Sequence, residues 1–285
     1  MSREVHVNGA WLPESEARVS VFDRGFLMAD AVYEVTAVLG ARLLDFPGHM
    51  ARLRRSLAEL RMPEPMDEPA WLLLHREAVR RNAVEDGLVY LQVTRGAADR
   101  DFAWPDPPVP PTVVLFTQSK PGLADGPALR TGIRVISVPD GRWARRDIKT
   151  TQLLFPSWAK MMAKERGADD AWMVEDGLVT EGSSNNAYIV AGGRLVTRGL
   201  GPEILSGITR AAVLRLAAEM QLKVEERPFT IEEAQGAEEA FVTSATTFVT
   251  PVVAIDGAAV GAGAPGPVAR RLRELYLEEG RRAAL

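Results

Sequence analysis

The chain of 285 residues contains no cysteine and three histidines, His6, His49 and His75. Without cysteine the protein cannot form a disulfide, a thiolate nucleophile or a zinc–thiolate centre. The wide spacing of the histidines along the sequence disfavours a metal site built on imidazole. We therefore expect no bound metal, and any cofactor should be organic.

The sequence also lacks long apolar runs. None approaches the roughly 20 residues that cross a bilayer, and residues 1–5 lack the apolar core of a signal peptide. The formal net charge of -4 disfavours nucleic acid and anionic membranes as partners, because both select a basic face. Apolar residues make up 46% of the chain, enough for a substantial core. These features predict a globular cytoplasmic protein.

Hydrophobic periodicity and turn signals predict that residues 1–119 form a small α+β domain. Strands are expected at residues 5–12 (a hairpin turning at Asn8 and Gly9), 18–21, 31–38, 43–46, 88–94 and 112–117, and helices at residues 47–60 and 69–82. Residues 120–127 are polar and rich in proline and glycine, which is typical of a linker.

Residues 128–285 predict a larger, strand-rich domain that is covered by helices. Helices are expected at residues 156–166, 209–220, 231–235 and from 265 onward, and strands or hairpins at residues 133–138, 171–179, 186–197, 224–229, 240–243 and 250–255. The strands do not alternate with helices as they do in a Rossmann fold. The predicted fold class is therefore α+β (mixed α/β), with two domains.

Lysine is scarce, with five in the chain, and Lys149 occupies an unusual position. It follows the expected strand at residues 133–138, and Arg142, Arg145 and Arg146 precede it closely. Cationic neighbours and burial disfavour the ammonium form of an amine and so favour its use as a nucleophile. The alternative is an ordinary surface lysine in a basic loop.

Three stretches could hold an anionic group. Gly207 and Thr209 lie at an expected helix start, where free N–H groups and the helix dipole favour a phosphate, although a plain helix cap is the alternative. Residues 180–186 place Glu181 before glycine and small polar residues, which suits either a binding loop or a polar turn. The hydroxyl-rich residues 243–247 suit either an anion site or a strand.

An activated lysine, a phosphate-binding helix start and a carboxylate are together what pyridoxal phosphate requires. The lysine forms the Schiff base, the helix start anchors the phosphate, and the carboxylate keeps the pyridine nitrogen protonated. Arg52, on an expected helix, is either a solvated charge or a further bidentate phosphate partner. The spacing of these residues does not by itself establish the cofactor.

Ordered matches along nearly the whole chain carry a resemblance to a known family. They are Asp23-Arg24-Gly25-Phe26, Val32-Tyr33-Glu34-Val35, Gln92-Val93-Thr94-Arg95-Gly96, Arg142-Trp143, Asp147-Ile148-Lys149, Val179-Thr180-Glu181-Gly182-Ser183-Ser184, Gly207-Ile208-Thr209-Arg210, Phe241-Val242-Thr243-Ser244 and Thr250-Pro251-Val252. The sequence resembles the fold-type IV pyridoxal-phosphate enzymes of the branched-chain aminotransferase superfamily, and among them the D-amino-acid aminotransferases.

The resemblance implies that Lys149 forms the Schiff base and moves the proton at the substrate Cα, while Glu181 pairs with the pyridinium nitrogen. It also implies that Tyr33, Arg100 and Phe102 face the substrate, with Arg100 contributed by the other subunit of a homodimer whose site lies at the subunit interface. The further residues expected around a cofactor held between the two domains are Arg52, Ser183, Ser184, Asn185, Leu205, Gly207, Ile208, Thr209, Ser244 and Ala245.

Two positions depart from the family pattern. Phe102 stands where the D-amino-acid enzymes carry a histidine, so half of the carboxylate trap is missing. Ala245 stands at the position of a phosphate-binding threonine, so Ser244 or Thr246 is expected to replace it, with Ser244 favoured by similar motifs in branched-chain relatives. Neither change affects the residues of the transamination step.

The resemblance predicts a transaminase that uses a D-amino acid and a 2-oxo acid such as pyruvate or 2-oxoglutarate. An (R)-selective amine transaminase is an alternative, because Phe102 makes the trap more apolar. A branched-chain L-amino-acid aminotransferase and an aminodeoxychorismate lyase share the same fold and cofactor contacts. A phosphate-ligand binding module without catalysis is the alternative outside enzymes, and the presence of Lys149 and Glu181 argues against it.

Overall fold

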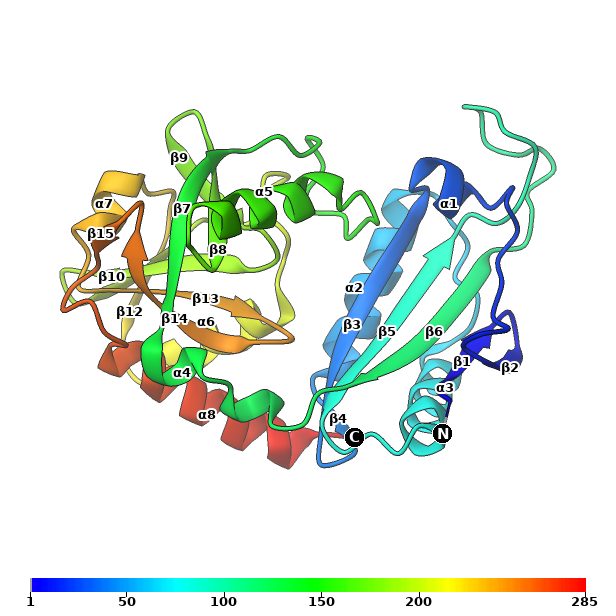
Figure 1. The fold of residues 1–285 in the computed structure, drawn as a ribbon, viewed down its shortest axis with the longest axis horizontal. Helices are drawn as coiled ribbons and strands as arrows, with labels where there is room; N and C mark the ends of the chain where they lie inside the picture. The colour runs from blue at the N-terminus through cyan, green and yellow to red at the C-terminus, as the bar shows by residue number, and fades with distance from the viewer. Residues whose placement is uncertain (1) are drawn as a thin grey trace. The chain divides into compact units, whose positions relative to one another are not determined.

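The computed structural model describes residues 2–285, which form two compact units (Figure 1). The first unit contains the chain up to Leu123 together with Ile148–Gln152 and Ala283–Leu285, and the second contains Ala124–Asp147 and Leu153–Arg282. The main boundary lies within the expected linker. The return of Ile148–Gln152 to the first unit differs from the expected contiguous domains, and nothing in the composition of this segment signals it.

The first unit is built on an antiparallel six-stranded sheet with the order β2-β1-β6-β5-β3-β4. The strands are β1 (Glu4–Val7), β2 (Ala10–Pro13), β3 (Ala31–Leu39), β4 (Arg42–Leu43), β5 (Gly87–Thr94) and β6 (Thr112–Ser119). The predicted first hairpin is confirmed. Asn8 and Gly9 at its turn have φ of 48° and 91°, the left-handed backbone that a tight hairpin requires and that this residue pair tolerates.

Two long helices pack against this sheet, and a short helix precedes β3 (Figure 1). They are α1 (Arg24–Met28), α2 (Phe46–Glu59) and α3 (Glu68–Arg81). Pro47 and Pro69 lie in the first turns of α2 and α3, where a missing N–H costs no helical hydrogen bond. Leu53, Leu57 and Trp71 are fully buried on the inner helix faces, so α2 and α3 form where the periodicity predicts.

Two predictions for the first unit were wrong in detail. Residues 18–21 form no strand, and Val19 and Val21 are 44% and 68% exposed, because β-branched residues form a strand only where a neighbouring strand pairs with them. The strand expected at residues 43–46 shortens to Arg42–Leu43, since Asp45 adopts a left-handed φ of 52° and α2 begins at Phe46.

The second unit is built on a mixed nine-stranded sheet with the order β12-β11-β10-β13-β14-β7-β8-β9, and β15 pairs with β14. The strands are β7 (Ile133–Pro139), β8 (Asp170–Glu175), β9 (Leu178–Gly182), β10 (Asn186–Ala191), β11 (Arg194–Thr197), β12 (Lys223–Glu226), β13 (Glu239–Ser244), β14 (Phe248–Ile255) and β15 (Ala258–Ala259). The parallel pairs are β14–β7, β7–β8 and β11–β12. The predicted strand-rich architecture is confirmed, with shifts of a few residues at element ends.

Helices cover the second sheet on its faces (Figure 1). After a short 3-10 helix at Leu123–Asp125, they are α4 (Ala128–Thr131), α5 (Leu154–Glu165), α6 (Ile208–Glu219), α7 (Ile231–Gln235) and α8 (Pro267–Ala283). Ala159 and Ala163 of α5 pack against Ile136 and Met173 of the sheet. Small residues on the helix let it approach the strands closely, so α5 covers the sheet at β7 and β8.

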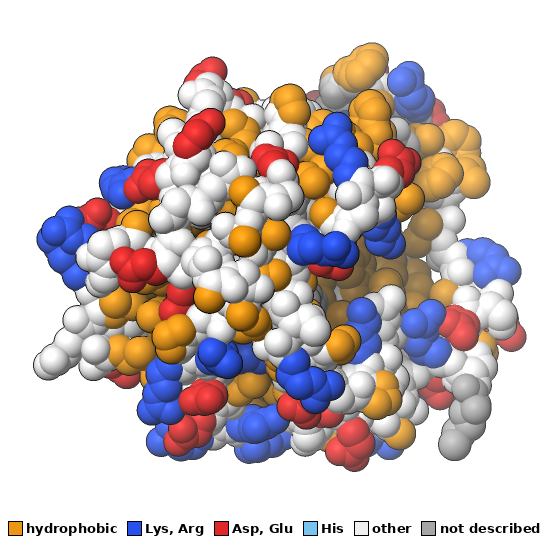
Figure 2. Space-filling model, turned by 60° about the vertical axis from the view of Figure 1, so that its left-hand side comes forward, with side chains coloured by type: hydrophobic (Ala, Val, Ile, Leu, Met, Phe, Trp, Pro, Cys, Tyr) orange, Lys and Arg blue, Asp and Glu red, His pale blue; other side chains and the backbone are white. Residues whose placement is uncertain are grey.

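Acidic and basic side chains are interspersed over the face that Figure 2 shows, with hydrophobic side chains between them. Within residues 2–285, no helix combines the length and the apolar character that crossing a membrane would require.

Candidate active site

Lys149 lies on a short extended segment that runs beside β3 in the first unit. The Tyr33 N–H donates to the Lys149 carbonyl at 3.0 Å, and the Thr151 N–H donates to the Ala31 carbonyl at 3.1 Å. These bonds fix the backbone of the segment on both sides of the lysine. The half-buried Lys149 amine lies 4.2 Å from the centroid of the Tyr33 ring, so the structure brings these two predicted site residues together.

The three arginines that precede Lys149 are all paired with carboxylates of the second unit. Arg142 pairs with Asp140 and Glu181, Arg145 with Asp147, and Arg146 with Glu175. The sequence interpretation used them as cationic neighbours that disfavour the ammonium form of Lys149, and it did not consider their counter-ions. That electrostatic picture was wrong, because each guanidinium is compensated by at least one carboxylate.

A buried ion pair lies behind β3, on the side opposite Tyr33. Arg52 of α2 donates to Glu34 through Nε and Nη2, both at 2.8 Å, and His49 Nδ1 lies 2.8 Å from the same carboxylate. Burial would raise the pKa of Glu34, but Arg52 and His49 outweigh it and lower that pKa to about 2. The bidentate pair holds the Arg52 guanidinium in one orientation, which is the property that phosphate binding by this residue would need.

Glu181 is a buried carboxylate with several hydrogen bonds at the predicted cofactor position. It lies at the end of β9, is 4% exposed, and accepts a hydrogen bond from Arg142 through one oxygen. Its second oxygen accepts from Asn186 Nδ2 at 3.0 Å and from the Leu205 N–H at 3.1 Å. Donors from three separate segments therefore hold the carboxylate in place.

The charge state of this group is set by two opposing effects. Burial raises the pKa of Glu181, and the adjacent Arg142 guanidinium acts in the opposite direction. Burial would lower the pKa of Arg142, but Asp140 and Glu181 outweigh it and raise that pKa. Arg142 therefore stays charged, whereas Glu181 is a buried carboxylate that a second cation would stabilise further.

Asp140 supports this arrangement from behind. Its oxygens accept from Arg142 Nε at 3.0 Å and Nη2 at 2.7 Å, and from the Thr180 hydroxyl at 2.7 Å. Arg146 Nε lies 3.5 Å from the same carboxylate. Asp140 thus orients Arg142, and Arg142 in turn meets Glu181.

The N-terminus of α6 lies beside the Glu181 network. Gly207 caps the helix, no side chain caps its first N–H groups, and Thr209 is 2% exposed. A Cβ on Gly207 would collide with Asn186 Oδ1, so the residue must be glycine for Asn186 to reach Glu181. In the second unit, Asn186 therefore lies against the positive N-terminus of α6 and also donates to the buried Glu181 carboxylate.

Residues 31–255 match the family model of class IV amino-transferases. The chain belongs to this family. The D-alanine aminotransferase of Staphylococcus aureus (strain MSSA476) is 35% identical over 271 residues, which cover 95% of this chain and 95% of that protein. The D-alanine aminotransferase of Bacillus licheniformis is 38% identical over 95% of this chain and 94% of that protein.

Solved structures of class IV amino-transferases share the fold. The branched-chain amino acid aminotransferase of Escherichia coli has a TM-score of 0.90 at 22% identity, over 98% of this chain and 95% of that chain. The branched-chain amino acid aminotransferase of T.th., solved with pyridoxamine 5'-phosphate, has a TM-score of 0.89 at 29% identity, over 98% of this chain and 94% of that chain. The predicted family resemblance and the fold-type IV α+β class are confirmed.

Several predicted cofactor residues of this class IV amino-transferase have structural partners of their own. Ser183 Oγ and Asn185 Nδ2 both donate to the buried Asp170, while Ser184 is exposed. Ser244 Oγ accepts from the Thr247 N–H at 3.1 Å in the turn after β13, which also contains Ala245. The side chains of Ser183, Asn185 and Ser244 therefore shape the loops, and their cofactor roles remain predictions.

The predicted substrate residues Arg100 and Phe102 lie in the loop between β5 and β6. Both are exposed, Phe102 to 83%, and the Arg100 guanidinium carbon lies 5.4 Å from the Phe102 ring centroid. Within the first unit they form a paired cationic and apolar surface.

Sequence reasoning missed Asn186 and Asp140 as part of this site. Asn186 is the first residue of β10, and a polar side chain that starts an otherwise apolar strand is the signal that could have revealed it. Asp140 follows β7 directly, two residues before Arg142. A carboxylate this close to a buried arginine could have shown that the arginine has a counter-ion.

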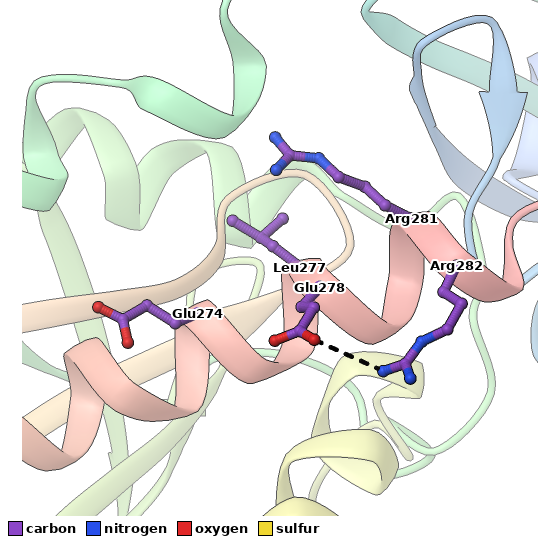
Figure 3. Close-up of a pocket in the computed structure, with 5 residues that line it drawn as sticks. All are labelled: Glu274, Leu277, Glu278, Arg281 and Arg282. Atoms are coloured by element: carbon purple, nitrogen blue, oxygen red, sulfur yellow. Dashed lines mark ion pairs between the residues drawn. The ribbon is translucent and has the colours of Figure 1, made fainter.

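A pocket on α8 lies apart from these residues in the sequence and in its lining. Figure 3 shows Glu274, Leu277, Glu278, Arg281 and Arg282 around it, with Glu278 and Arg282 paired at 3.9 Å. None of the predicted site residues lines this pocket. This pocket therefore lies outside the candidate active site.

Proposed function

We propose that this class IV amino-transferase is a pyridoxal-phosphate enzyme that moves an amino group from a D-amino acid to a 2-oxo acid such as pyruvate or 2-oxoglutarate. The observation that carries the proposal is the buried Glu181 carboxylate, because a pyridinium nitrogen requires an anion that water does not screen. Similarity to D-alanine aminotransferases over 95% of the chain supports the D-amino-acid substrate.

The residues fit the three functional parts of the cofactor. Lys149 offers an amine for its aldehyde carbon, Glu181 an anion for its ring nitrogen, and the start of α6 free N–H groups for its phosphate. When bound, pyridoxal phosphate supplies a ring that accepts the electrons released at the substrate Cα. The amine of Lys149 would then accept and return the proton at that atom.

The phosphate would be held by the N–H groups of Ile208 and Thr209, by the Thr209 hydroxyl and by Arg52. Glu34 holds the Arg52 guanidinium in one orientation. The half-buried Leu205 would rest against the cofactor ring, while its own N–H holds Glu181. Ser183, Ser184, Asn185, Gly207, Ser244 and Ala245 complete the proposed shell.

We assign substrate contacts to Tyr33, Arg100 and Phe102, in a homodimer whose subunits complete one another's site. Exposure of both Arg100 and Phe102, which contact each other, supports this assignment, because an exposed cation and an exposed aromatic ring are available to a neighbour. Arg100 would bind the α-carboxylate as a bidentate partner.

One observation favours a second candidate function, an (R)-selective amine transaminase. Phe102 places an apolar ring beside Arg100, so a substrate group without a carboxylate would lose less on binding than it would beside two polar side chains. Within the proposed enzyme, both activities would use the same lysine and the same carboxylate.

The cofactor assignment is tested on the purified protein. We expect a yellow protein, and borohydride reduction should attach the cofactor covalently to Lys149, as located by peptide mass spectrometry. A Lys149→Ala variant should lose the attachment and a Lys164→Ala variant should keep it. A protein that stays colourless after addition of pyridoxal phosphate would contradict the assignment, as would labelling at another lysine.

The substrate assignment is tested by incubation with single enantiomers of alanine, leucine and 1-phenylethylamine, scoring the keto product. D-Alanine should be turned over faster than L-leucine. Faster turnover of L-leucine would identify a branched-chain enzyme, and faster turnover of (R)-1-phenylethylamine would select the second candidate.

A further inference from the structure

The loop between β5 and β6 holds exposed side chains in place without a core of its own. Residues 95–111 contain five prolines and no helix, and Phe102 near the tip is 83% exposed. A ring that is this exposed gains little from burial of apolar surface. The position of Arg100 and Phe102 must therefore come from anchors on the loop backbone.

The first anchor is Arg24, whose side chain is 4% exposed at the start of α1. Its Nη1 donates to the carbonyl of Asp101 at 2.7 Å and to the carbonyl of Ala103 at 3.1 Å. These two carbonyls lie on either side of Phe102. One buried guanidinium therefore holds the carbonyls of the residues before and after the exposed ring.

The second anchor is Arg95, which shares a counter-ion with Arg24. Asp30 Oδ2 accepts from Arg24 Nε at 2.8 Å and from Arg95 Nε at 2.7 Å. The Arg95 guanidinium carbon lies 4.2 Å from the centroid of the Trp104 ring, within the range of a cation–π contact. Two arginines on one carboxylate thus fix the loop at residues 101–104.

This arrangement requires the planar fork of arginine at position 24. The guanidinium pairs with Asp30 through one edge and donates to both carbonyls through another nitrogen. A lysine ammonium is a compact charge on a flexible stem, so it could keep the pair with Asp30 but could not also span the two peptide groups. The matched motif at residues 23–26 therefore has a specific physical task.

We propose that Arg24 is a positioning residue that fixes Arg100 and Phe102 as one preset recognition surface for the carboxylate-bearing end of the substrate. This inference rests on the proposed function, in which those two side chains contact substrate. Arg24 itself, buried below the loop, contacts the backbone and not the substrate. Its loss should weaken carboxylate recognition without altering the cofactor.

The test compares Arg24→Lys with wild type and with Arg18→Ala, an exposed arginine of the same unit that donates to the neighbouring Ala17 carbonyl. In Arg24→Lys we expect the KM for D-alanine to rise about tenfold, equivalent to about 1.4 kcal/mol, with kcat within about threefold. The KM for a simple amine without a carboxylate should change less than about twofold. Arg18→Ala should match wild type.

Hydrogen exchange of residues 97–111 gives a readout that does not depend on activity. It should accelerate in Arg24→Lys and stay unchanged in Arg18→Ala. Trp104→Ala removes the ring that Arg95 contacts and changes an exposed side chain. It should reproduce both effects more weakly. Because this residue is not buried, the variant also tests the proposal if Arg24→Lys misfolds.

Three outcomes overturn the proposal: unchanged exchange in the loop, an unchanged KM for D-alanine, or equal rises in KM for both substrates. If wild type transaminates neither substrate, the proposed function fails. Accelerated exchange would then still show that Arg24 anchors the loop, so the two failures are distinguishable.

Discussion

Each unit contains one buried glutamate paired with an arginine, yet the two carboxylates respond to burial in opposite ways. In the first unit, Arg52 and His49 outweigh burial and lower the pKa of Glu34 to about 2. In the second unit, burial dominates and the pKa of Glu181 is raised, although Arg142 is in direct contact. The difference lies in how each arginine is shared.

Arg52 gives two nitrogens to Glu34, whereas Arg142 divides its donors between Glu181 and Asp140. The remaining partners of Glu181 are an amide side chain and a backbone N–H, which carry no net charge. Glu34 therefore has its full counter-charge within the protein. Glu181 lacks part of it, which is consistent with the proposal that this carboxylate pairs with a cationic ring.

Glu34→Gln should have the largest effect, and it should fall on stability. The substitution leaves Arg52 charged and without its carboxylate in a buried position, which typically costs about 3–5 kcal/mol. Urea unfolding should show this loss in the free energy of unfolding. Glu77→Gln, at an exposed ion pair with Arg80 and Arg81, is the matched control and should change it little. Equal losses in both variants would mean that burial is not the cause.

Glu181→Gln should act on catalysis instead. An amide cannot hold the proton on the pyridine nitrogen, so kcat for D-alanine should fall about 10²–10³-fold, the usual effect of removing one preorganised electrostatic partner. Stopped-flow measurement of the first half-reaction checks this value. The free energy of unfolding should fall less than in Glu34→Gln. An unchanged kcat would remove Glu181 from the proposed chemistry.

As the pH falls, protonation of His75 should destabilise the protein before protonation of Glu34 does. Burial lowers the pKa of His75 to about 4. Between pH 6.5 and pH 4, His75 is therefore protonated in the unfolded chain and neutral in the folded protein. Stability is complete above pH 6.5 and is lost as the pH falls toward 4. The loss between pH 7 and pH 5 should be about 2 kcal/mol, measured by urea unfolding.

A His75→Gln variant supplies the control, because it cannot titrate in this range and should show a flatter pH dependence. Glu34 is an acid and not a base, but its contribution to stability is also lost as the pH falls. This contribution is present above pH 4.5 and is lost only as the pH falls toward 2. A wild-type profile that is flat between pH 7 and pH 5 would contradict the assignment to His75.

Gly207→Ala should have the smallest effect. The added Cβ would displace Asn186, whose side-chain oxygen already occupies that place, and would loosen one of the three donors to Glu181. We expect kcat to fall about tenfold, near the 1.4 kcal/mol of one hydrogen bond to a charged group. Asn186→Ala should give a similar loss. Gly126→Ala, at a glycine without a positive φ and with no atom within 4 Å of the added Cβ, should leave kcat unchanged.

Local patterns predicted much of the fold because they act over a few residues. The α2 and α3 helices, the Asn8-Gly9 turn and most strands of both sheets form where periodicity and turn residues indicate. The strand expected at residues 18–21 failed because pairing depends on a distant neighbour. For the same reason the sequence does not reveal that Lys149 pairs with β3, since Tyr33 and Lys149 are far apart in the chain.

In the candidate site, residue type alone suggested roles for Glu181 and Lys149, and these roles remain predictions. The residues that support Glu181 were missed. Asn186 and Asp140 matter because of which atoms they meet, and hydrogen-bond partners across three segments cannot be derived from spacing. The error about the arginines near Lys149 has this origin, because their counter-ions include Glu175 and Glu181 from other strands.

The segment Ile148–Gln152 can join the first unit only late in synthesis, and Ala283–Leu285 can join it only at the end. Ile148–Gln152 docks beside β3 although β7, which precedes it, already belongs to the second unit. A nascent chain that has emerged up to residue 119 contains all six strands of the sheet, β1 to β6, but no lysine. The Lys149 segment can join that sheet only after the ribosome has made the first strand of the other unit, so an N-terminal fragment would lack the residue to which we assign the Schiff base.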